Sequence, residues 1–200
     1  MEYNTLNDEE IVNYEAKEKR NFFNLNIRLG VNFSSLEIEV TGQSRNYVVD
    51  FGSQVNFRFG LEAELILGFN KNKWSIIFEP TYQSYNADTL NNVTEFKTTY
   101  KSIEAPIGVR YYMFLNDQSK FFVNGQFCMD FSFNSIIERN NSTDLDIFDS
   151  LNFCFGLGYK YNDRFSLEAR SYTKRNVLNG YYFWIGDYNT FSVILGYTLF

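Results

Sequence analysis

The sequence predicts an all-β protein: a closed, antiparallel, up-and-down transmembrane β-barrel of about eight strands. Three observations lead to this fold class. Apolar and polar residues alternate with a period of two, the connections alternate between short and long, and the apolar face carries no charge through the middle of the segments. Two hundred residues suffice for one such domain. We expect residues 1–20 to form a polar N-terminal segment or linker and residues 21–200 to form the barrel domain.

Residues 23–33 show the alternation most clearly, because every odd position is apolar and every even position is polar or glycine. A period of two is typical of a strand whose two faces meet different surroundings. A helix would scatter the same residues around its whole circumference. The other predicted strands repeat the pattern over residues 55–67, 74–85, 102–114, 121–134, 151–161, 165–174 and 190–200.

The connections between these segments fall into two classes. Short polar turns are predicted at residues 68–73, 115–120 and 162–164, and long loops at 34–54, 86–101, 135–150 and 175–189. Short periplasmic turns and long extracellular loops are typical of outer-membrane barrels. An even number of strands places both ends of the barrel on the periplasmic side.

The charges indicate which face points inward. The polar face carries six acidic and six basic residues, namely Glu62, Glu64, Glu79, Glu104, Asp130, Glu168, Arg28, Arg58, Arg110, Lys160, Arg170 and Lys174. These charges balance, whereas the whole chain has a net charge of -6. Because an unpaired buried charge costs several kcal/mol, the balance favours a confined interior. We predict that all of these residues except Lys174 form an interior ion-pair network, in which the glutamates share Arg58, Arg110 and Arg170.

The outward face would then meet lipid. It is rich in Phe, Leu, Val and Ile, and an Arg or Lys at mid-depth of a bilayer would cost about 2–4 kcal/mol. Aromatic residues near the strand ends fit an interfacial girdle: Trp74, Tyr82, Tyr111, Tyr159, Tyr161 and Tyr197.

Two other functions fit the same alternation. A soluble lipocalin-like barrel would turn its apolar face inward and bind lipid there. A narrow porin-like channel would conduct small solutes through the charged lumen. We favour a lumen closed by salt bridges, since a barrel of about eight strands is just wide enough for side chains to fill.

No enzymatic, cofactor or metal site is predicted. The sequence has no histidine, which removes histidine-based triads and metal sites, and its two cysteines are too few for a four-cysteine zinc site. Cys128 and Cys154 share inward parity on neighbouring strands. A cross-strand disulfide and two buried thiols at the wrong register both fit this placement.

One loop concentrates aromatic residues. Tyr181, Tyr182, Phe183 and Trp184 are a candidate contact site, because loops carry function more often than the scaffold that holds them. The alternative is that they continue the outer aromatic girdle above the bilayer.

Three stretches resemble a known family: LGVNFSSLEIEV, FGLEAELILGFNKNKWSIIFEPTYQSY and KSIEAPIGVRYYMF. They are similar to the small outer-membrane β-barrel domain of Bacteroidetes-type bacteria, the PorT-like group, in the order of Gly-Leu-Glu, Trp, Glu-Pro-Thr-Tyr and Glu-Ala-Pro. The resemblance covers most of residues 19–200. It implies an outer-membrane location and a roughly eight-stranded barrel, and it implies no single activity. Phe200 resembles the aromatic end used in barrel assembly, although it is one residue out of phase with the apolar series before it.

We therefore expect a bacterial outer-membrane protein that acts as a structural or interaction module of the envelope. Its expected partners are lipid, lipopolysaccharide and, through the long loops, other envelope proteins. Nucleic acid is not expected, because the net charge of -6 leaves no basic face. Residues 1–20 contain no apolar stretch typical of a signal peptide, so a mature or truncated chain is expected.

Overall fold

The computed structural model describes residues 22–41, 47–91, 94–140 and 142–200. The predicted N-terminal segment 1–20 lies outside the described residues. The strands in chain order are β1 (Phe23–Val40), β2 (Tyr47–Leu67), β3 (Trp74–Phe78), β4 (Thr81–Asn91), β5 (Thr94–Phe114), β6 (Ser119–Ser132), β7 (Ile136–Arg139), β8 (Leu145–Asp146), β9 (Ser150–Tyr161), β10 (Phe165–Tyr172), β11 (Arg175–Asn176) and β12 (Trp184–Thr198). A short 3-10 helix, η1 (Asn70–Asn72), lies between β2 and β3. The described residues contain no helix long and apolar enough to cross a membrane.

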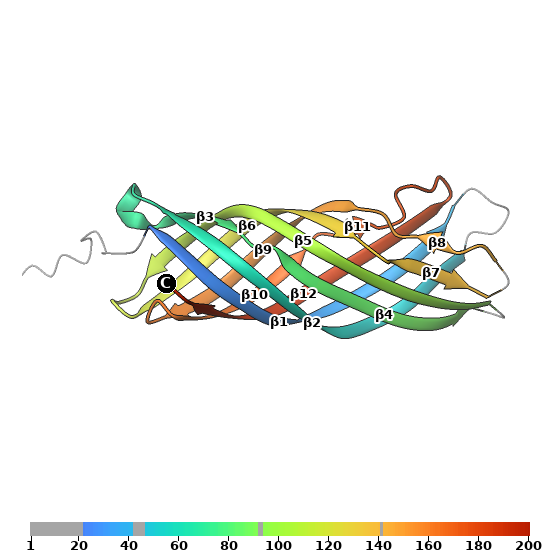
Figure 1. Ribbon diagram of the computed structural model, residues 1–200, viewed down its shortest axis with the longest axis horizontal. Coiled ribbons are helices and arrows are strands. Elements are labelled where there is room, and N and C mark those ends of the chain that lie inside the picture. Colours follow the sequence, from blue (N-terminus) through green and yellow to red (C-terminus); the bar gives the residue numbers. More distant parts are fainter. Residues whose placement is uncertain (1–21, 42–46, 92–93, 141) are drawn as a thin grey trace, which may run out of the picture.

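The strands form an elongated, closed antiparallel barrel (Figure 1). Around the wall β1 pairs with β12, β12 with β10, β10 with β9, β9 with β6 and β6 with β5. β5 then pairs with β3 and β4, both of these pair with β2, and β2 returns to β1. The predicted closed up-and-down barrel is therefore observed.

The described residues form twelve strand segments, and the barrel wall has eight positions when β3 and β4 are counted as one interrupted strand, in agreement with the predicted number of about eight. The predicted strand 74–85 is divided into β3 and β4 at Glu79 and Pro80, because proline has no amide hydrogen for the ladder. The carbonyl of Pro80 still accepts a bond from the Leu61 amide at 3.1 Å. The remaining additional strands, β7, β8 and β11, are short and lie in segments predicted as loops.

A belt of exposed apolar side chains surrounds the part of the barrel nearest the chain ends. Its members include Leu29, Phe57, Ile107, Phe127, Phe155, Leu167 and Leu195. At the strand ends beside the short connections, aromatic pairs fit the predicted girdle. The ring centroids are 4.9 Å apart for Trp74 and Tyr111 and 5.3 Å apart for Phe165 and Tyr197.

Beyond the belt, the predicted long loops 34–54 and 86–101 are in large part extensions of strands. In β1 the inward side chains change from Asn32 and Ser34 to Leu36 and Ile38, while the outward Glu37 is exposed. The period of two continues, but the two faces exchange their chemistry. The exchange indicates that these extensions leave lipid and enter water, where a strand must bury its apolar face.

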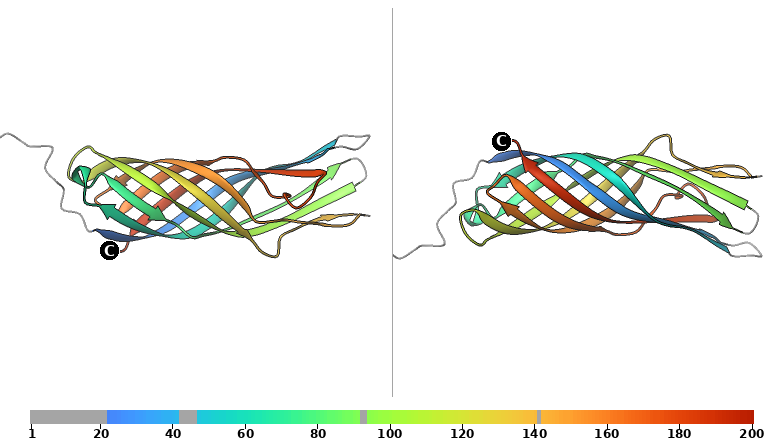
Figure 2. Two further views of the ribbon diagram at one scale, coloured as in Figure 1. Left: turned by 90° about the horizontal axis from the view of Figure 1, so that it is seen from above. Right: turned by 90° about the horizontal axis from the view of Figure 1, so that it is seen from below.

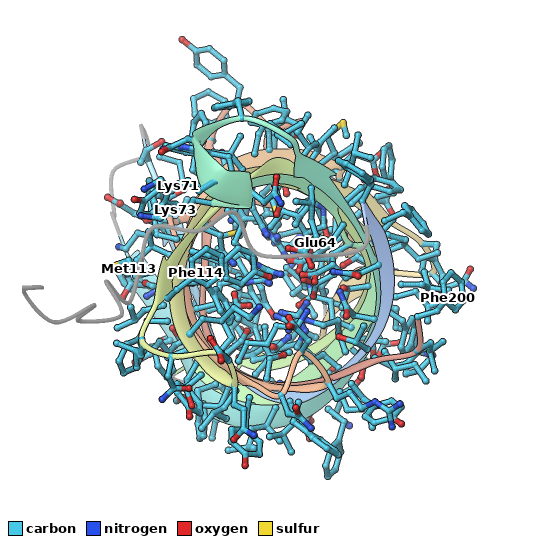
Figure 3. All side chains as sticks on the ribbon, turned by 90° about the vertical axis from the view of Figure 1, so that its left-hand side faces the viewer. Glu64, Lys71, Lys73, Met113, Phe114 and Phe200 are labelled. Atoms are coloured by element: carbon cyan, nitrogen blue, oxygen red, sulfur yellow. The ribbon has the colours of Figure 1, made fainter. Side chains whose placement is uncertain are left out.

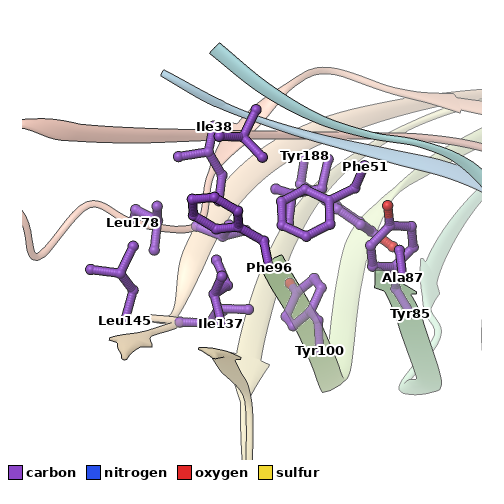
Figure 4. Packing of buried hydrophobic residues seen from close by; sticks show 14 residues of the cluster. Ile38, Phe51, Tyr85, Ala87, Phe96, Tyr100, Ile137, Leu145, Leu178 and Tyr188 are labelled. Carbon is purple, nitrogen blue, oxygen red and sulfur yellow. The ribbon is translucent and has the colours of Figure 1, made fainter. Parts of the chain in front are cut away.

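The extensions form a two-layered body, which we call the head (described residues 35–40, 47–53, 84–91, 94–101, 135–140, 142–149 and 174–189). One layer consists of β2, β1, β12 and β11, and the other of β4, β5, β7 and β8. An apolar cluster fills the space between them (Figure 4): Leu36, Ile38, Val49, Phe51, Tyr85, Ala87, Phe96, Tyr100, Ile137, Leu145, Ile147, Val177, Leu178 and Tyr188. The head therefore resembles a small β-sandwich built on top of a barrel.

The opposite end, which we call the turn end, carries the short connections and the C-terminus (Figure 2). The Leu25 amide donates to the Phe200 carbonyl at 3.0 Å, so the last residue lies beside β1. Phe200 points outward, as Figure 3 shows, and its ring lies 6.2 Å from that of Phe23. The predicted mismatch of phase is resolved because β12 ends at Thr198, after which side chains no longer alternate.

The exposed belt predicts a position-dependent cost of charge. Leu29→Arg places a cation in the middle of the belt, whereas Ser35→Arg places it on the same outward face of β1 just beyond the belt. We expect Leu29→Arg to lower the free energy of unfolding in lipid vesicles by about 2–4 kcal/mol and Ser35→Arg by less than about 1 kcal/mol. Urea unfolding in vesicles measures both values. Equal stability of the two variants would contradict a lipid-facing belt.

Candidate functional site: the charged lumen and the head

The alternation of the strands directs a dense set of charged side chains into the lumen. The structure places all eleven residues of the predicted network there, each with at most 2% of its surface exposed: Arg28, Arg58, Glu62, Glu64, Glu79, Glu104, Arg110, Asp130, Lys160, Glu168 and Arg170. Glycines leave room for these long side chains. A side chain at Gly196 would overlap Arg28, and one at Gly156 would overlap Glu168.

Glu79 and Glu168 form the centre of the network. Glu79 accepts hydrogen bonds from Arg58 at 2.7 Å and from Arg170 at 2.6 Å. Glu168 accepts from the Arg170 Nε at 2.7 Å and from Arg28. Each carboxylate thus joins arginines from different strands, and charge-assisted bonds of this kind are the strongest hydrogen bonds in proteins.

Two further acids lie toward the turn end. Glu62 receives both terminal nitrogens of Arg110, at 2.9 and 2.7 Å, and the Asn26 amide at 2.8 Å. Glu64, labelled inside the ring in Figure 3, accepts from the Tyr112 hydroxyl at 2.6 Å and lies 3.6 Å from the Lys160 Nζ. The bidentate Arg110 contact fixes both side chains in one orientation.

The network changes partners toward the head. Glu104 was expected to share Arg58, Arg110 and Arg170, but it accepts instead from Arg175 at 2.6 Å and from Gln83 at 3.0 Å. The second Arg175 nitrogen lies 3.5 Å from Asp130, whose other oxygen accepts from Tyr100.

Arg175 and Lys120 are interior cations that the sequence did not reveal, because both were assigned to connections. Lys174, which was counted on the polar face, is exposed and lies 3.4 Å from Asp187. The lumen of the described chain therefore holds six acids and seven bases, all of them buried. The additional cation, Lys120, pairs with Asp163 at the turn end over 2.5 Å. The inward-facing cation is Arg175 and not the predicted Lys174, because β10 ends at Tyr172 and side chains no longer alternate between the two faces after it.

Both cysteines are buried free thiols. The β6–β9 register sets Cys128 opposite Asn152 and Cys154 opposite Gln126, so the two cysteines are not directly paired. The Cys154 thiol donates to the Gln126 side chain at 3.2 Å. Of the two readings that the sequence left open, the structure shows the buried thiols.

The predicted aromatic contact site divides into two pairs. Tyr181 and Trp184 pack against the apolar cluster of the head, and the Arg139 guanidinium lies 4.7 Å above the Trp184 ring. Tyr182 and Phe183 are exposed, by 91% and 43% respectively. The second pair is therefore the more exposed part of the predicted site, while Tyr181 and Trp184 are partly buried.

The surface of the head is strongly acidic. Its described residues carry ten acids and four bases that are not buried. The acids are Glu37, Glu39, Asp50, Asp88, Glu95, Glu138, Asp144, Asp146, Asp149 and Asp187, and the bases are Lys97, Lys101, Arg139 and Lys174. The charges of the head that are not buried therefore sum to -6, while those of the lumen nearly cancel.

An exposed apolar belt around a wall with a charged, buried lumen is the arrangement of a membrane barrel. The sequence model of the outer membrane protein beta-barrel domain family matches residues 13–173. This chain belongs to that family. Its outer-membrane location excludes the soluble lipocalin-like alternative. In such a barrel we expect the turn end to face the periplasm and the head to lie outside the cell.

The chain is similar to several solved outer-membrane proteins. OprG from Pseudomonas aeruginosa is 14% identical, with a TM-score of 0.54 over 88% of this chain and 95% of that chain. Ail of Yersinia pestis, solved in complex with the heparin analogue sucrose octasulfate, is 14% identical, with a TM-score of 0.46 over 88% of this chain and 99% of that chain. Neisserial surface protein A is 11% identical, with a TM-score of 0.46 over 86% and 96% of the two chains. Among curated proteins, none matches the chain.

The network predicts that a single central acid is essential for stability. Glu79→Ala leaves Arg58 and Arg170 buried without their shared acceptor, so we expect the free energy of unfolding to fall by about 3–5 kcal/mol. Glu95→Ala removes an exposed partner of Lys97 and should cost less than about 1 kcal/mol. Urea unfolding in vesicles compares the two variants. A Glu79→Ala barrel as stable as the Glu95→Ala control would show that pairing does not hold the lumen together.

Proposed function

We propose that this outer-membrane barrel is a closed, non-conducting anchor that presents its head as an interaction module outside the cell. The observation that carries the proposal is that side chains fill both halves of the molecule. Ion pairs occupy the lumen within the belt, and the apolar cluster occupies the head above it.

The rival function, a narrow channel for small solutes, requires a continuous polar path along the axis. The lumen within the belt is polar, but the path meets Phe51, Phe96 and Tyr188 in the head, each of which is at most 4% exposed. Hydrated solutes lose their water in such an apolar region, which disfavours their passage.

Composition and charge support the proposed partners. Lipid and lipopolysaccharide surround the belt, and a cationic partner protein fits the acidic surface of the head. We infer a non-enzymatic role, because the sequence has no histidine and its interior carboxylates are engaged with arginines and tyrosines.

We further propose that the chain belongs to the PorT-like group of Bacteroidetes-type bacteria. The motifs that carry this resemblance, Gly-Leu-Glu, Glu-Pro-Thr-Tyr and Glu-Ala-Pro, contribute Glu62, Glu79 and Glu104 to the lumen. The shared sequence features are thus the acids of the ion-pair network, together with the proline that interrupts the β3–β4 wall.

Planar-bilayer recording tests the closed lumen. We expect the purified chain to produce no conductance steps across a range of applied voltages, under conditions in which a general porin conducts. Heat-modifiable gel migration of the same preparation verifies that the inserted chain is folded. Steady ohmic steps from the folded protein would overturn the proposal and favour the channel.

A further inference from the structure

The head is open along one side. The ladder between β2 and β4 contains only three pairs, from Gly60 with Thr81 to Arg58 with Gln83. Beyond it, the described pairings join residues 47–57 of β2 only to β1 and residues 84–91 of β4 only to β5. We call these two facing edges the β2–β4 seam. Figure 2 shows the β1–β2 pair of strands and the β4–β5 pair of strands separated from each other at the head end of the molecule.

The opposite side of the head is tied together. The Phe148 amide donates to the Val177 carbonyl at 2.9 Å, and the Asp146 amide donates to the Tyr181 hydroxyl at the same distance. Across the seam, two side-chain hydrogen bonds take the place of a backbone ladder. The Tyr85 hydroxyl donates to the Gly52 carbonyl at 3.3 Å, and the Asn91 side-chain amide donates to the Val48 carbonyl at 3.0 Å. No described ladder joins the two edges of the seam, so its backbone can accept another strand, which would replace these two side-chain bonds.

The two edges of the seam differ in regularity. β2 shifts its register against β1 between Ser35 and Glu37, and the nearby Gly52 has a φ of 68° with its amide bonded to Asp50. Bulges of this kind bend an edge and protect it from added strands. β4 pairs with β5 from Thr81 to Asn91 without any shift, and it carries neither proline nor lysine. The regular edge of β4 is thus the better template.

The side chains that border the seam form three zones. Val55 and Phe57, exposed by 64% and 83%, belong to the belt and border the base of the seam at the membrane boundary, and Val48 and Leu90, exposed by 51% and 68%, lie at its tip. The bonds of Tyr85 and Asn91 set Asp50 and Asp88 at a similar height between these zones. The order of the zones from base to tip is apolar, acidic, apolar.

We propose that the seam binds an extended segment of a partner protein by strand addition along β4. The bound segment presents a Lys or Arg between two apolar residues at alternate, outward-facing positions. Main-chain bonds supply the affinity in this mode of recognition, and alternate side chains supply the specificity. The basic residue faces Asp50 and Asp88, and the acidic surface of the head attracts it. This inference rests on the proposed function of the head as an interaction module.

A synthetic peptide of sequence Thr-Val-Thr-Lys-Thr-Val-Thr, capped at both ends, serves as the probe. We expect the full chain in lipid nanodiscs to bind it, as measured by fluorescence anisotropy, with slower amide exchange over residues 84–91. A peptide methylated on alternate backbone nitrogens should not bind, because it cannot complete the ladder. Replacement of the peptide's Lys by Glu should weaken binding about fivefold, as expected for lost and reversed surface charge pairing.

A matched pair of variants locates the site. Asp88→Lys, within the seam, should weaken binding of the Lys peptide about fivefold, whereas Asp146→Lys makes the same charge change on β8 and should leave binding unchanged. Equal binding of the methylated peptide, unchanged exchange over residues 84–91, or equal effects of the two variants would each overturn the proposal.

A dimer in which residues 84–91 are already protected without peptide would also overturn it, because a second copy would then occupy the seam. A barrel that stays non-conducting but ignores the peptide would refute the seam alone. Conductance steps would instead refute the closed anchor, whether or not the peptide binds.

Discussion

The structure depends on the mutual neutralisation of charges in a narrow, closed cylinder. Arg28 on β1 reaches Glu168 on β10, Arg110 on β5 reaches Glu62 on β2, and Arg170 on β10 reaches Glu79 between β3 and β4. Each pair therefore spans the lumen and joins strands that are not neighbours. Charges taken out of water are tolerated only where such partners are in place. These ion pairs require a closed wall, and they link distant parts of that wall.

The same strands serve two solvents. Within the belt, β1 turns Leu29 and Phe33 to lipid and Arg28 and Asn32 to the lumen; in the head it turns Glu37 to water and Leu36 inward. The alternation with a period of two persists along the strand, so the sheet is continuous. Apolar side chains point outward in lipid and inward in water. A membrane barrel and a water-exposed sandwich are thereby combined in one sheet.

This division also separates roles. The lumen nearly balances its charge internally, which leaves it little to offer a ligand, whereas the head concentrates unbalanced acidic charge on an exposed surface. The head is also the part of the molecule in which the backbone ladder between β2 and β4 is incomplete. These features support the proposal that the head, and not the lumen, meets a partner.

The sequence by itself determined the barrel, the outward belt and eleven interior charges, because a period of two assigns each residue of a strand to a face without knowledge of its neighbours. It also placed Cys128 and Cys154 inward. Only the tertiary structure decided which acid meets which arginine, that Arg175 and not Lys174 enters the lumen, and that the two thiols are offset. It likewise showed that the supposed loops are strands of a packed head. These features depend on register, strand length and contacts across the cylinder, and alternation along a single segment contains no information about any of them.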